Sequence, residues 1–251
     1  MPTWNPHQYL KFADERSRPC RDLAARVEVA APRRIIDLGC GPGNSAEVLS
    51  ARWPEAAIAG LDSSAAMIDA ARAASPQCEW RIGEIATWAA GDDRFDVVFS
   101  NAALQWVDAH AAIFPQLLSR VCEGGALAVQ VPGNYKEPQH QLMREVATRF
   151  GLQVSGWRTH DLDFYYDALA PHSARLDLWA TEYLHVLPNV EAVVEWYKGT
   201  GLRPYLDALG SEEDRDRFLG EYLEGLRAIY APQADGAVLF PFRRIFIVAY
   251  A

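Results

Sequence analysis

The feature that most constrains this chain is a glycine-spaced turn that follows an apolar run near residue 40. The segment reads Ile35-Ile36-Asp37-Leu38-Gly39-Cys40-Gly41-Pro42-Gly43-Asn44. Glycine lacks a Cβ, so such a turn can adopt positive φ and bring its backbone close to another molecule. An apolar run that breaks into alternating glycines predicts the first strand and first turn of an α/β sheet that binds a ligand.

A second apolar run, over residues 57–61, ends in Asp62, eighteen residues after Asn44. An acid at the end of the second strand of such a sheet can accept hydrogen bonds from both hydroxyl groups of a ribose. The glycine turn and this acid together predict a nucleoside-containing cofactor at the carboxyl edge of a parallel sheet.

Strand-like and helix-like patterns alternate along the first half of the chain. Apolar runs of strand length occupy residues 33–38, 57–61, 78–82, 95–100 and 126–131. Helical spacing of apolar residues lies between most of them, as in 45–52 and 65–74. Strand–helix alternation predicts right-handed crossovers and a parallel sheet. Glu123-Gly124-Gly125 is interpreted as the turn into the fifth strand.

The pattern changes after Pro132. We expect a helix over 137–150, an irregular segment over 151–163, a long strand over 175–186 and a closing strand over 242–250. Residues 190–230 have mostly helical spacing, interrupted by glycines at 199–201 and 210. We interpret the chain as one domain over residues 1–251. Its core is expected at about 19–135, 163–187 and 238–251, and its cap or lid at about 1–18, 136–162 and 188–235.

Charge and cysteine usage limit the class of partner. The formal net charge is −9, which disfavours a nucleic-acid partner because phosphate binding needs a basic surface. Cys20, Cys40, Cys78 and Cys122 lie far apart, so neither a metal site nor a disulfide framework is expected. No targeting signal or membrane-spanning apolar run is seen, so a cytoplasmic protein without membrane contact is the expectation.

The glycine turn does not match the pyrophosphate-binding pattern GxGxxG. Counting from Gly39, the third glycine of that pattern would fall at position 44, where this chain has Asn44. Asp37 would repel a pyrophosphate but suits an ammonium or sulfonium group. S-adenosylmethionine has both groups, a ribose and no phosphate. Glu84, after the third strand, is placed to accept the adenine amino group, with Ile85 over the base; a solvated loop acid is an equally good interpretation of Glu84.

Residues 37–44, Asp62, Gly83-Glu84 and residues 95–106 resemble the class I S-adenosylmethionine-dependent methyltransferases. The resemblance implies an α/β, Rossmann-like seven-stranded sheet that is mostly parallel, with its last strand antiparallel. It implies S-adenosylmethionine as cofactor, S-adenosylhomocysteine as product, and no metal. The implied cofactor contacts are Asp37, Gly39, Gly41, Asn44, Asp62, Ser63, Glu84, Ile85 and Asn101.

Further segments are similar to one subfamily, the trans-aconitate 2-methyltransferases. They are Trp4-Asn5-Pro6, Glu15-Arg16-Ser17-Arg18-Pro19, Asn101 to Trp106, Ala128-Val129-Gln130-Val131-Pro132, Leu142 to Ala147, and Thr200-Gly201-Leu202-Arg203-Pro204. This similarity implies monomethyl esterification of a small polycarboxylate substrate, trans-aconitate. Residues 151–162 and 170–175 depart from the subfamily pattern.

The chemistry of a carboxylate acceptor fits a site without a general base. A carboxylate has a reference pKa near ~4 and is already a nucleophile at neutral pH. We therefore expect no catalytic proton-abstracting residue, and expect arginines to bind the polyanion. The candidate acceptor residues are Arg203, Arg244, Arg16, Trp106 and Tyr166, each of which has an ordinary surface or core role as its alternative.

Two other enzyme functions stay open at this point, and a non-catalytic cofactor-binding or scaffolding module is a third alternative, although the expected cap favours a small-molecule pocket. The same fold could serve an amine, phenol or carbon acceptor, which would need a base or an aromatic slot instead of converging arginines. A nicotinamide-dependent oxidoreductase could use the glycine turn for a pyrophosphate, although Asp37 and the turn's spacing disfavour this. The sequence assigns no oligomeric state.

Overall fold

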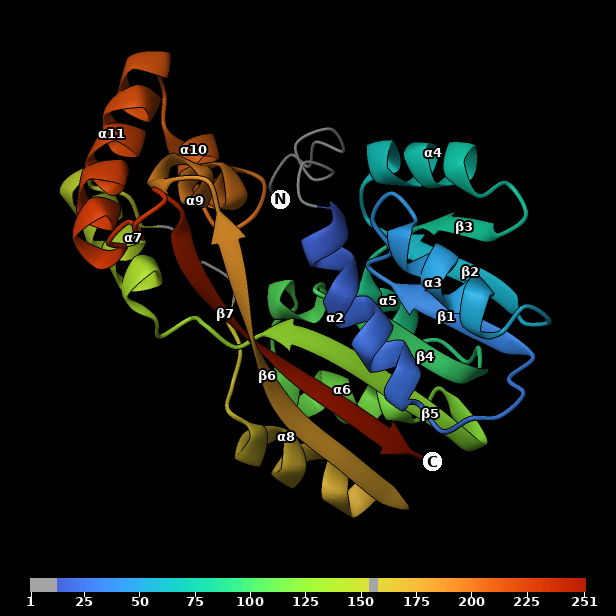
Figure 1. Cartoon of the computed structure of the whole chain (residues 1–251). Coiled ribbons are helices and arrows are strands. Elements are labelled where there is room, and N and C mark those ends of the chain that lie inside the picture. The colour runs from blue at the N-terminus through green and yellow to red at the C-terminus, as the bar shows by residue number, and fades with distance from the viewer. Residues whose placement is uncertain (1–12, 154–157) are drawn as a thin grey trace. The chain divides into compact units, whose positions relative to one another are not determined.

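The computed structural model describes residues 13–153 and 158–251, with side chains of the first helix described from Ser17 onward. Its central feature is a seven-stranded sheet of order β3-β2-β1-β4-β5-β7-β6 (Figure 1). Strands β1 to β5 pair in parallel and β7 pairs antiparallel to β5, which confirms the expected fold class. The strands are β1 (Arg34–Leu38), β2 (Ala57–Asp62), β3 (Glu79–Ile82), β4 (Phe95–Asn101), β5 (Val121–Pro132), β6 (Arg175–Leu187) and β7 (Val238–Tyr250).

Helices connect these strands and form most of the region between β6 and β7 (Figure 1). They are α2 (Ala13–Arg26), α3 (Asn44–Arg52), α4 (Ala65–Ala74), α5 (Ile85–Ala89), α6 (His110–Leu118), α7 (Pro138–Arg149), α8 (Leu162–Leu169), α9 (Val190–Lys198), α10 (Arg203–Ala208) and α11 (Glu212–Ile229), with short 3₁₀ turns η1 (Leu104–Trp106) and η2 (Ala170–His172). Within the described residues, none of these helices combines the length and apolarity that a membrane crossing requires.

The chain divides into two compact units. The first, here the sheet unit, comprises residues 13–133, 158–181 and 244–251; the second, here the helical unit, is described over 134–153 and 182–243. The expected core included all of 175–187 and 238–251, whereas the structure assigns 182–187 and 238–243 to the helical unit. The two units therefore share β6 and β7, because each strand continues beyond the part that belongs to the sheet unit.

The core of the sheet unit is formed by strand side chains that point to one face of the sheet, since side-chain direction alternates along each strand. Residues two apart on a strand share a face, so Ile36 and Leu38 of β1 point to the side opposite Asp37. They join a buried cluster that includes Val98 and Phe114. Helices α6 and α8 cover this face, and α2 packs on β5 and α3, as Figure 1 also shows.

The helical unit has a separate aromatic core. Trp196 and Tyr197 of α9 are buried together with Phe218 and Tyr222 of α11 and with Phe240 of β7. The expected interruptions of the helical region are real, since α9 ends before Gly199 and α10 ends before Gly210. Large aromatic side chains bury the most apolar area per residue, so this small unit obtains a core from few positions.

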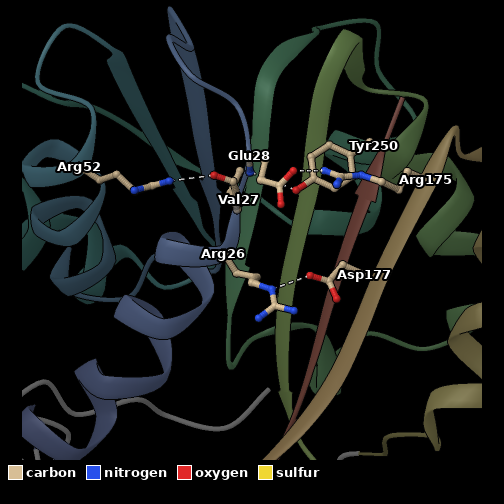
Figure 2. Close-up of polar contacts among 7 residues, drawn as sticks. All are labelled: Arg26, Val27, Glu28, Arg52, Arg175, Asp177 and Tyr250. Carbon is tan, nitrogen blue, oxygen red and sulfur yellow. Dashed lines mark hydrogen bonds and ion pairs between the residues drawn. The ribbon is translucent and has the colours of Figure 1, made fainter.

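The end of α2 and the segment after it are held against strands β6 and β7 (Figure 2). Arg26 Nε pairs with Asp177 Oδ2 at 2.7 Å, and Arg175 Nη2 pairs with Glu28 Oε2 at 2.7 Å. The backbone N–H of Glu28 donates to the Tyr250 hydroxyl at 3.0 Å. These ion pairs lie at the surface, where solvent screens them, so their main effect is to place charges along the edge strand β6.

One expected boundary was wrong. Glu123-Gly124-Gly125 was interpreted as the turn into the fifth strand, but β5 begins at Val121 and includes these residues. The register to β4 shifts between Phe95 and Val97, and Gly124 has φ +76°. A glycine at positive φ is typical of a β-bulge, in which a strand continues past an unpaired residue.

Candidate active site

The loops that follow the parallel strands are connected to one another by backbone hydrogen bonds. The N–H of Gly39 donates to the carbonyl of Leu61 at 2.7 Å, and the N–H of Gly83 donates to the carbonyl of Asp62 at 3.0 Å. The N–H of Ala102 donates to the carbonyl of Gln130 at 2.9 Å. The carboxyl ends of β1 to β5 therefore form one continuous edge, which is where α/β sheets bind ligands.

Each glycine of the turn after β1 has positive φ, but the space around the glycines differs. At Gly39, φ is +71° and an added Cβ would collide with the Cβ of Ala103 in the loop after β4. At Gly41, φ is +54° and an added Cβ would meet nothing within 4 Å. Gly39 is thus required for packing of two loops, whereas the space beside Gly41 is open to a ligand.

Asp62 binds the glycine turn directly. Its Oδ2 accepts a hydrogen bond from the Gly41 N–H at 3.0 Å, and its Oδ1 accepts one from the Ser64 N–H at 2.9 Å. Burial raises the pKa of Asp62, while these two backbone hydrogen bonds oppose the rise. Each oxygen retains a second acceptor position. The carboxylate is therefore held in one orientation with capacity for two more donors. The neighbouring Ser63 is exposed.

Asp37 is the most unusual acid in the site. It is fully buried, and neither carboxyl oxygen has a hydrogen-bond partner among the described residues. Burial, and secondly the charge of Asp62, raise the pKa of Asp37 to about 8, with the nearby Ser45 hydroxyl opposing part of the rise without forming a well-aligned hydrogen bond. A buried, unpartnered carboxyl group suits a cationic ligand.

The strand register places three of the expected cofactor residues on one face of the sheet. Asp37 pairs with Gly60 on β2 and with Phe99 on β4. Asp62 and Asn101 follow those partners by two residues, so all three side chains project to the same side. The Oδ1 atom of Asn101 is also buried without a partner in the described part of the chain. Two acids and an amide oxygen make this part of the edge rich in acceptors.

The same face continues across β5 and β7. Asn101 pairs with Gln130, and Pro132 pairs with Arg244. The Arg244 side chain is buried, with 5% of its surface exposed, and its Nη1 donates to Gln130 Oε1 at 3.3 Å. The carboxyl edge therefore changes from acceptors over β1, β2 and β4 to donors over β5 and β7.

The structure places the expected adenine-contacting residues where the third strand ends. Glu84 is exposed and immediately precedes α5, and Ile85 is half-buried, with its Cδ1 3.8 Å from the position that a Cβ on Gly39 would take. Ile82 was not among the expected residues. It pairs with Asp62 in the sheet and is 55% exposed, which is unusual for a large apolar side chain at such an edge. Ile82 is the last residue of an apolar run, and nothing in the sequence separates it from the buried residues of that run. Asn44 opens α3 and is half-buried.

A buried pair that the sequence did not reveal supports the loop after β4. His110 Nε2 lies 2.9 Å from the Leu104 carbonyl, and His110 Nδ1 lies 2.9 Å from the Tyr165 hydroxyl. Because a carbonyl only accepts, Nε2 carries the proton and Nδ1 accepts from Tyr165. Burial lowers the pKa of His110, which favours this neutral form. The pair fixes η1 and thus the backbone of Trp106, a half-buried side chain.

The remaining acceptor candidates differ in their surroundings. Tyr166 is 54% exposed on α8, in contrast to the buried Tyr165 beside it. Arg203 opens α10 in the helical unit and its Nε lies 3.1 Å from Asp207 Oδ1. The side chain of Arg16 falls outside the described residues. The edge of the sheet unit therefore brings together Arg244 and the cofactor candidates, while Arg203 is described within its own unit.

The residues present fit S-adenosylmethionine better than a dinucleotide. The acidic groups beside the glycine turn are the buried Asp37 and the half-buried Asp62, which favour a cation, and Gly41 leaves space for the ligand. In residues 13–153 and 158–251 no cluster of three potential metal ligands occurs. The nicotinamide alternative is not favoured, because a pyrophosphate beside the turn would lie against two acids, and ionisation of either acid would repel it.

Comparison with known proteins gives the family of the chain. A family described as a methyltransferase domain matches residues 35–125. A trans-aconitate 2-methyltransferase of Azoarcus sp. (strain BH72) is 48% identical over 253 residues, covering 99% of each chain. One of Rhodopseudomonas palustris (strain BisB5) is 48% identical over 262 residues, again covering 99% of each chain.

Solved structures support the fold. The YcgJ protein of Bacillus subtilis has a TM-score of 0.61 at 14% identity, covering 92% of this chain and 97% of its own. A Haemonchus contortus phosphoethanolamine N-methyltransferase 2, in complex with S-adenosyl-L-methionine, has a TM-score of 0.56 at 14% identity, covering 92% of this chain and 52% of its own. With relatives identical at nearly half of their positions over nearly their whole length, this chain belongs to the trans-aconitate 2-methyltransferase family of class I S-adenosylmethionine-dependent methyltransferases.

Proposed function

We propose that this protein transfers a methyl group from S-adenosylmethionine to one carboxylate of trans-aconitate, forming a monomethyl ester. The observation that carries the proposal is the 48% identity, over 99% of both chains, to a relative named trans-aconitate 2-methyltransferase. Similarity that extends over the whole chain includes the segments outside the cofactor motifs, where acceptor contacts would be made.

The cofactor is proposed to bind at the carboxyl edge of β1, β2 and β4. Asp37 would face its cationic group, Asp62 would accept from the ribose hydroxyls, and Asn101 would offer its free Oδ1. The backbone beside Gly41 would approach the ligand, since no side chain fills that space. Asn44, Ser63, Glu84 and Ile85 complete the proposed set, with Ile82 added because of its exposed apolar side chain.

When bound, S-adenosylmethionine would supply an electrophilic methyl group on its sulfonium, with S-adenosylhomocysteine as the leaving group. The acceptor carboxylate is anionic at neutral pH, so its oxygen would be a competent nucleophile without removal of a proton. The protein's task is then to orient and desolvate that oxygen, and orientation can supply about 7–11 kcal/mol. Consistent with this, we assign no general base.

The acceptor's other carboxylates need donors. Arg244 supplies a buried guanidinium on the same face as Asn101, and arginine's planar fork suits a carboxylate. Arg203 is proposed as the second cation, although its ion pair with Asp207 would have to compete with the substrate. Trp106 is proposed to line the path between the cofactor methyl group and the acceptor. Tyr166 and Arg16 are weaker candidates for binding the acceptor. The proposed compartment is the cytoplasm.

The test is an acceptor screen read out by incorporation of labelled methyl groups and by mass spectrometry of the product. Trans-aconitate and related di- and tricarboxylates are compared with amines, phenols and activated carbon acids. We expect a monomethyl ester of trans-aconitate as the main product. Methylation of a nitrogen, phenol or carbon acceptor, with no methylation of the polycarboxylates, would contradict the proposal.

A variant tests the proposed second cation. Arg203→Ala should raise the KM for trans-aconitate and leave cofactor affinity unchanged; an unchanged KM would remove Arg203 from the site.

A further inference from the structure

One buried side chain at the carboxyl edge has no part in the cofactor site proposed above. Gln130 lies on β5 with none of its surface exposed. Its Oε1 accepts a hydrogen bond from Arg244 Nη1 at 3.3 Å, while its Nε2 has no partner among the described residues. Buried amide groups are nearly always hydrogen-bonded on both ends, so a free Nε2 requires an explanation.

The orientation of this amide follows from its neighbour. A guanidinium can only donate hydrogen bonds, so the atom of Gln130 that faces Arg244 must be the oxygen. The NH₂ group is thereby turned away from Arg244. Gln130 thus has two distinct ends, one that positions the arginine and one that presents two unused donor hydrogens.

These donors lie on the ligand-binding face of the sheet. Gln130 pairs with Asn101 of β4, and Pro132, two residues further on, pairs with Arg244. Asn101 Oδ1 is also unpartnered, so the two amides do not satisfy each other. The Nε2 of Gln130 and the guanidinium of Arg244 together form a buried donor cluster on the sheet unit, next to the acceptor Asn101 of β4.

We propose that Gln130 is a specificity-determining residue that, together with Arg244, binds one non-reacting carboxylate of the acceptor. The inference rests on the proposed carboxylate methyltransferase function. Its Nε2 donates to a carboxylate oxygen, and its Oε1 holds the guanidinium in the orientation needed to donate to the same group. Binding this carboxylate fixes the position of the acceptor and hence of the oxygen that is methylated.

The neutral amide matters for this role. A glutamate at position 130 would form an internal ion pair with Arg244 and consume the charge that the substrate needs. An apolar residue of similar size would fill the space but supply no donor. Gln130 instead accepts a hydrogen bond from the arginine and places no negative charge beside it, while its own Nε2 supplies the donor for an anionic ligand.

The test compares Gln130→Met and Gln130→Glu with the wild-type enzyme. Gln116→Met serves as the control, because Gln116 is an exposed glutamine on α6 of the same unit. We expect Gln130→Met to raise the KM for trans-aconitate by about tenfold to a hundredfold, as expected for loss of hydrogen bonds to a charged group. Gln130→Glu should raise it at least as much. The dissociation constant for S-adenosylmethionine, measured by calorimetry, should stay within about twofold in both variants.

A substrate cycle separates this role from a structural one. Wild type and Gln130→Met are each assayed with trans-aconitate and with the diacids that lack one of its carboxylates. For the diacid that lacks the carboxylate bound by Gln130, the variant and the wild type should have equal kcat/KM, since the interaction is already missing. The decisive quantity is kcat/KM for trans-aconitate divided by kcat/KM for each diacid. If this ratio is the same in wild type and Gln130→Met for every diacid, the inference is overturned.

The remaining outcomes are distinguishable. If the wild type methylates no polycarboxylate, the proposed function fails, and this inference fails with it. If the wild type methylates trans-aconitate but neither Gln130 variant changes its KM, only this inference is refuted. Should Gln130→Met fail to fold, Gln130→Glu, which keeps the length and the polarity of the side chain, decides the question by the same ratios.

Discussion

We predict that cofactor binding is coupled to release of a proton from Asp37. In the ligand-free protein, burial and the neighbouring Asp62 raise the pKa of the Asp37 carboxyl to about 8. At neutral pH the group therefore carries a proton. A cation placed against it would favour the ionised form, because opposite charges at close range lower the pKa of an acid. We expect binding of S-adenosylmethionine to release up to one proton from Asp37 at pH 7.

The magnitude follows from that pKa. If only the ionised form binds well, the apparent affinity scales with the ionised fraction, which is about 1% at pH 6, about 10% at pH 7 and about half at pH 8. The cofactor affinity should thus increase about fiftyfold from pH 6 to pH 8, equivalent to about 2.3 kcal/mol. Above pH 9 it should become constant as the fraction approaches one.

The assay is titration calorimetry of cofactor binding at several pH values. Each pH is measured in two buffers with different ionisation enthalpies, which yields the number of protons released. Asp37→Asn keeps the shape of the side chain but cannot ionise, so its affinity should be independent of pH and weaker than the wild type at pH 8. Asp69→Asn is the matched control, because Asp69 is an exposed aspartate on α4 that is paired with Arg72.

Two results would refute the reasoning. A wild-type affinity that is constant between pH 6 and pH 8, with no proton released, would show that Asp37 is ionised without the ligand or does not face its cation. A pH dependence that persists in Asp37→Asn would assign the titrating group elsewhere, with Asp62 the next candidate, since burial also raises its pKa.

Four further outcomes are expected. Because the pKa of Asp37 is higher in the folded than in the unfolded protein, the ligand-free enzyme should lose stability as pH rises from about 4 to about 8, by up to about 1.4 kcal/mol per pH unit; thermal unfolding of Asp37→Asn should lack this slope. Asp62→Ala should weaken cofactor binding at least about tenfold by calorimetry, since it removes the proposed ribose acceptor and loosens the turn at Gly41; equal affinity would exclude that role. Gly39→Ala should destabilise the fold by about 2–4 kcal/mol in denaturant unfolding, because it combines positive φ with a collision at Ala103, and a stable variant would contradict this account. At saturating cofactor, kcat should be flat between about pH 6 and pH 8; a steep decrease below pH 7 would indicate a base.

Much of the sheet unit could be predicted from local pattern. Strands β1 to β4 lie within one or two residues of the apolar runs that predicted them, because a buried parallel strand has to be continuously apolar. The glycine turn was also visible, since glycine adopts positive φ far more readily than other residues, as at Gly39, Gly41 and Gly43. The expected turn at Gly124 was wrong because a bulge and a turn have the same glycine requirement.

The acceptor side of the site depended on contacts between distant residues. Nothing local marks His110 and Tyr165 as partners, or Gln130 as the residue that orients Arg244. Each pair joins residues more than fifty positions apart. Packing of α6 against α8 brings His110 to Tyr165, whereas strand order and register bring Gln130 to Arg244. Likewise, a one-residue change of register would have turned Gln130 to the opposite face of the sheet.

The amino-acid sequence by itself determined the parallel core, the position of the cofactor turn and the family of the protein, because these depend on residue type, periodicity and short spacing. Only the tertiary structure decided which buried polar groups lack a partner. Whether Asp37, Asn101 and Gln130 are satisfied depends on the atoms that the fold packs around each carboxyl and amide group. Burial and unmet hydrogen bonds are properties of that packing, and these three side chains are where we expect the ligands to bind.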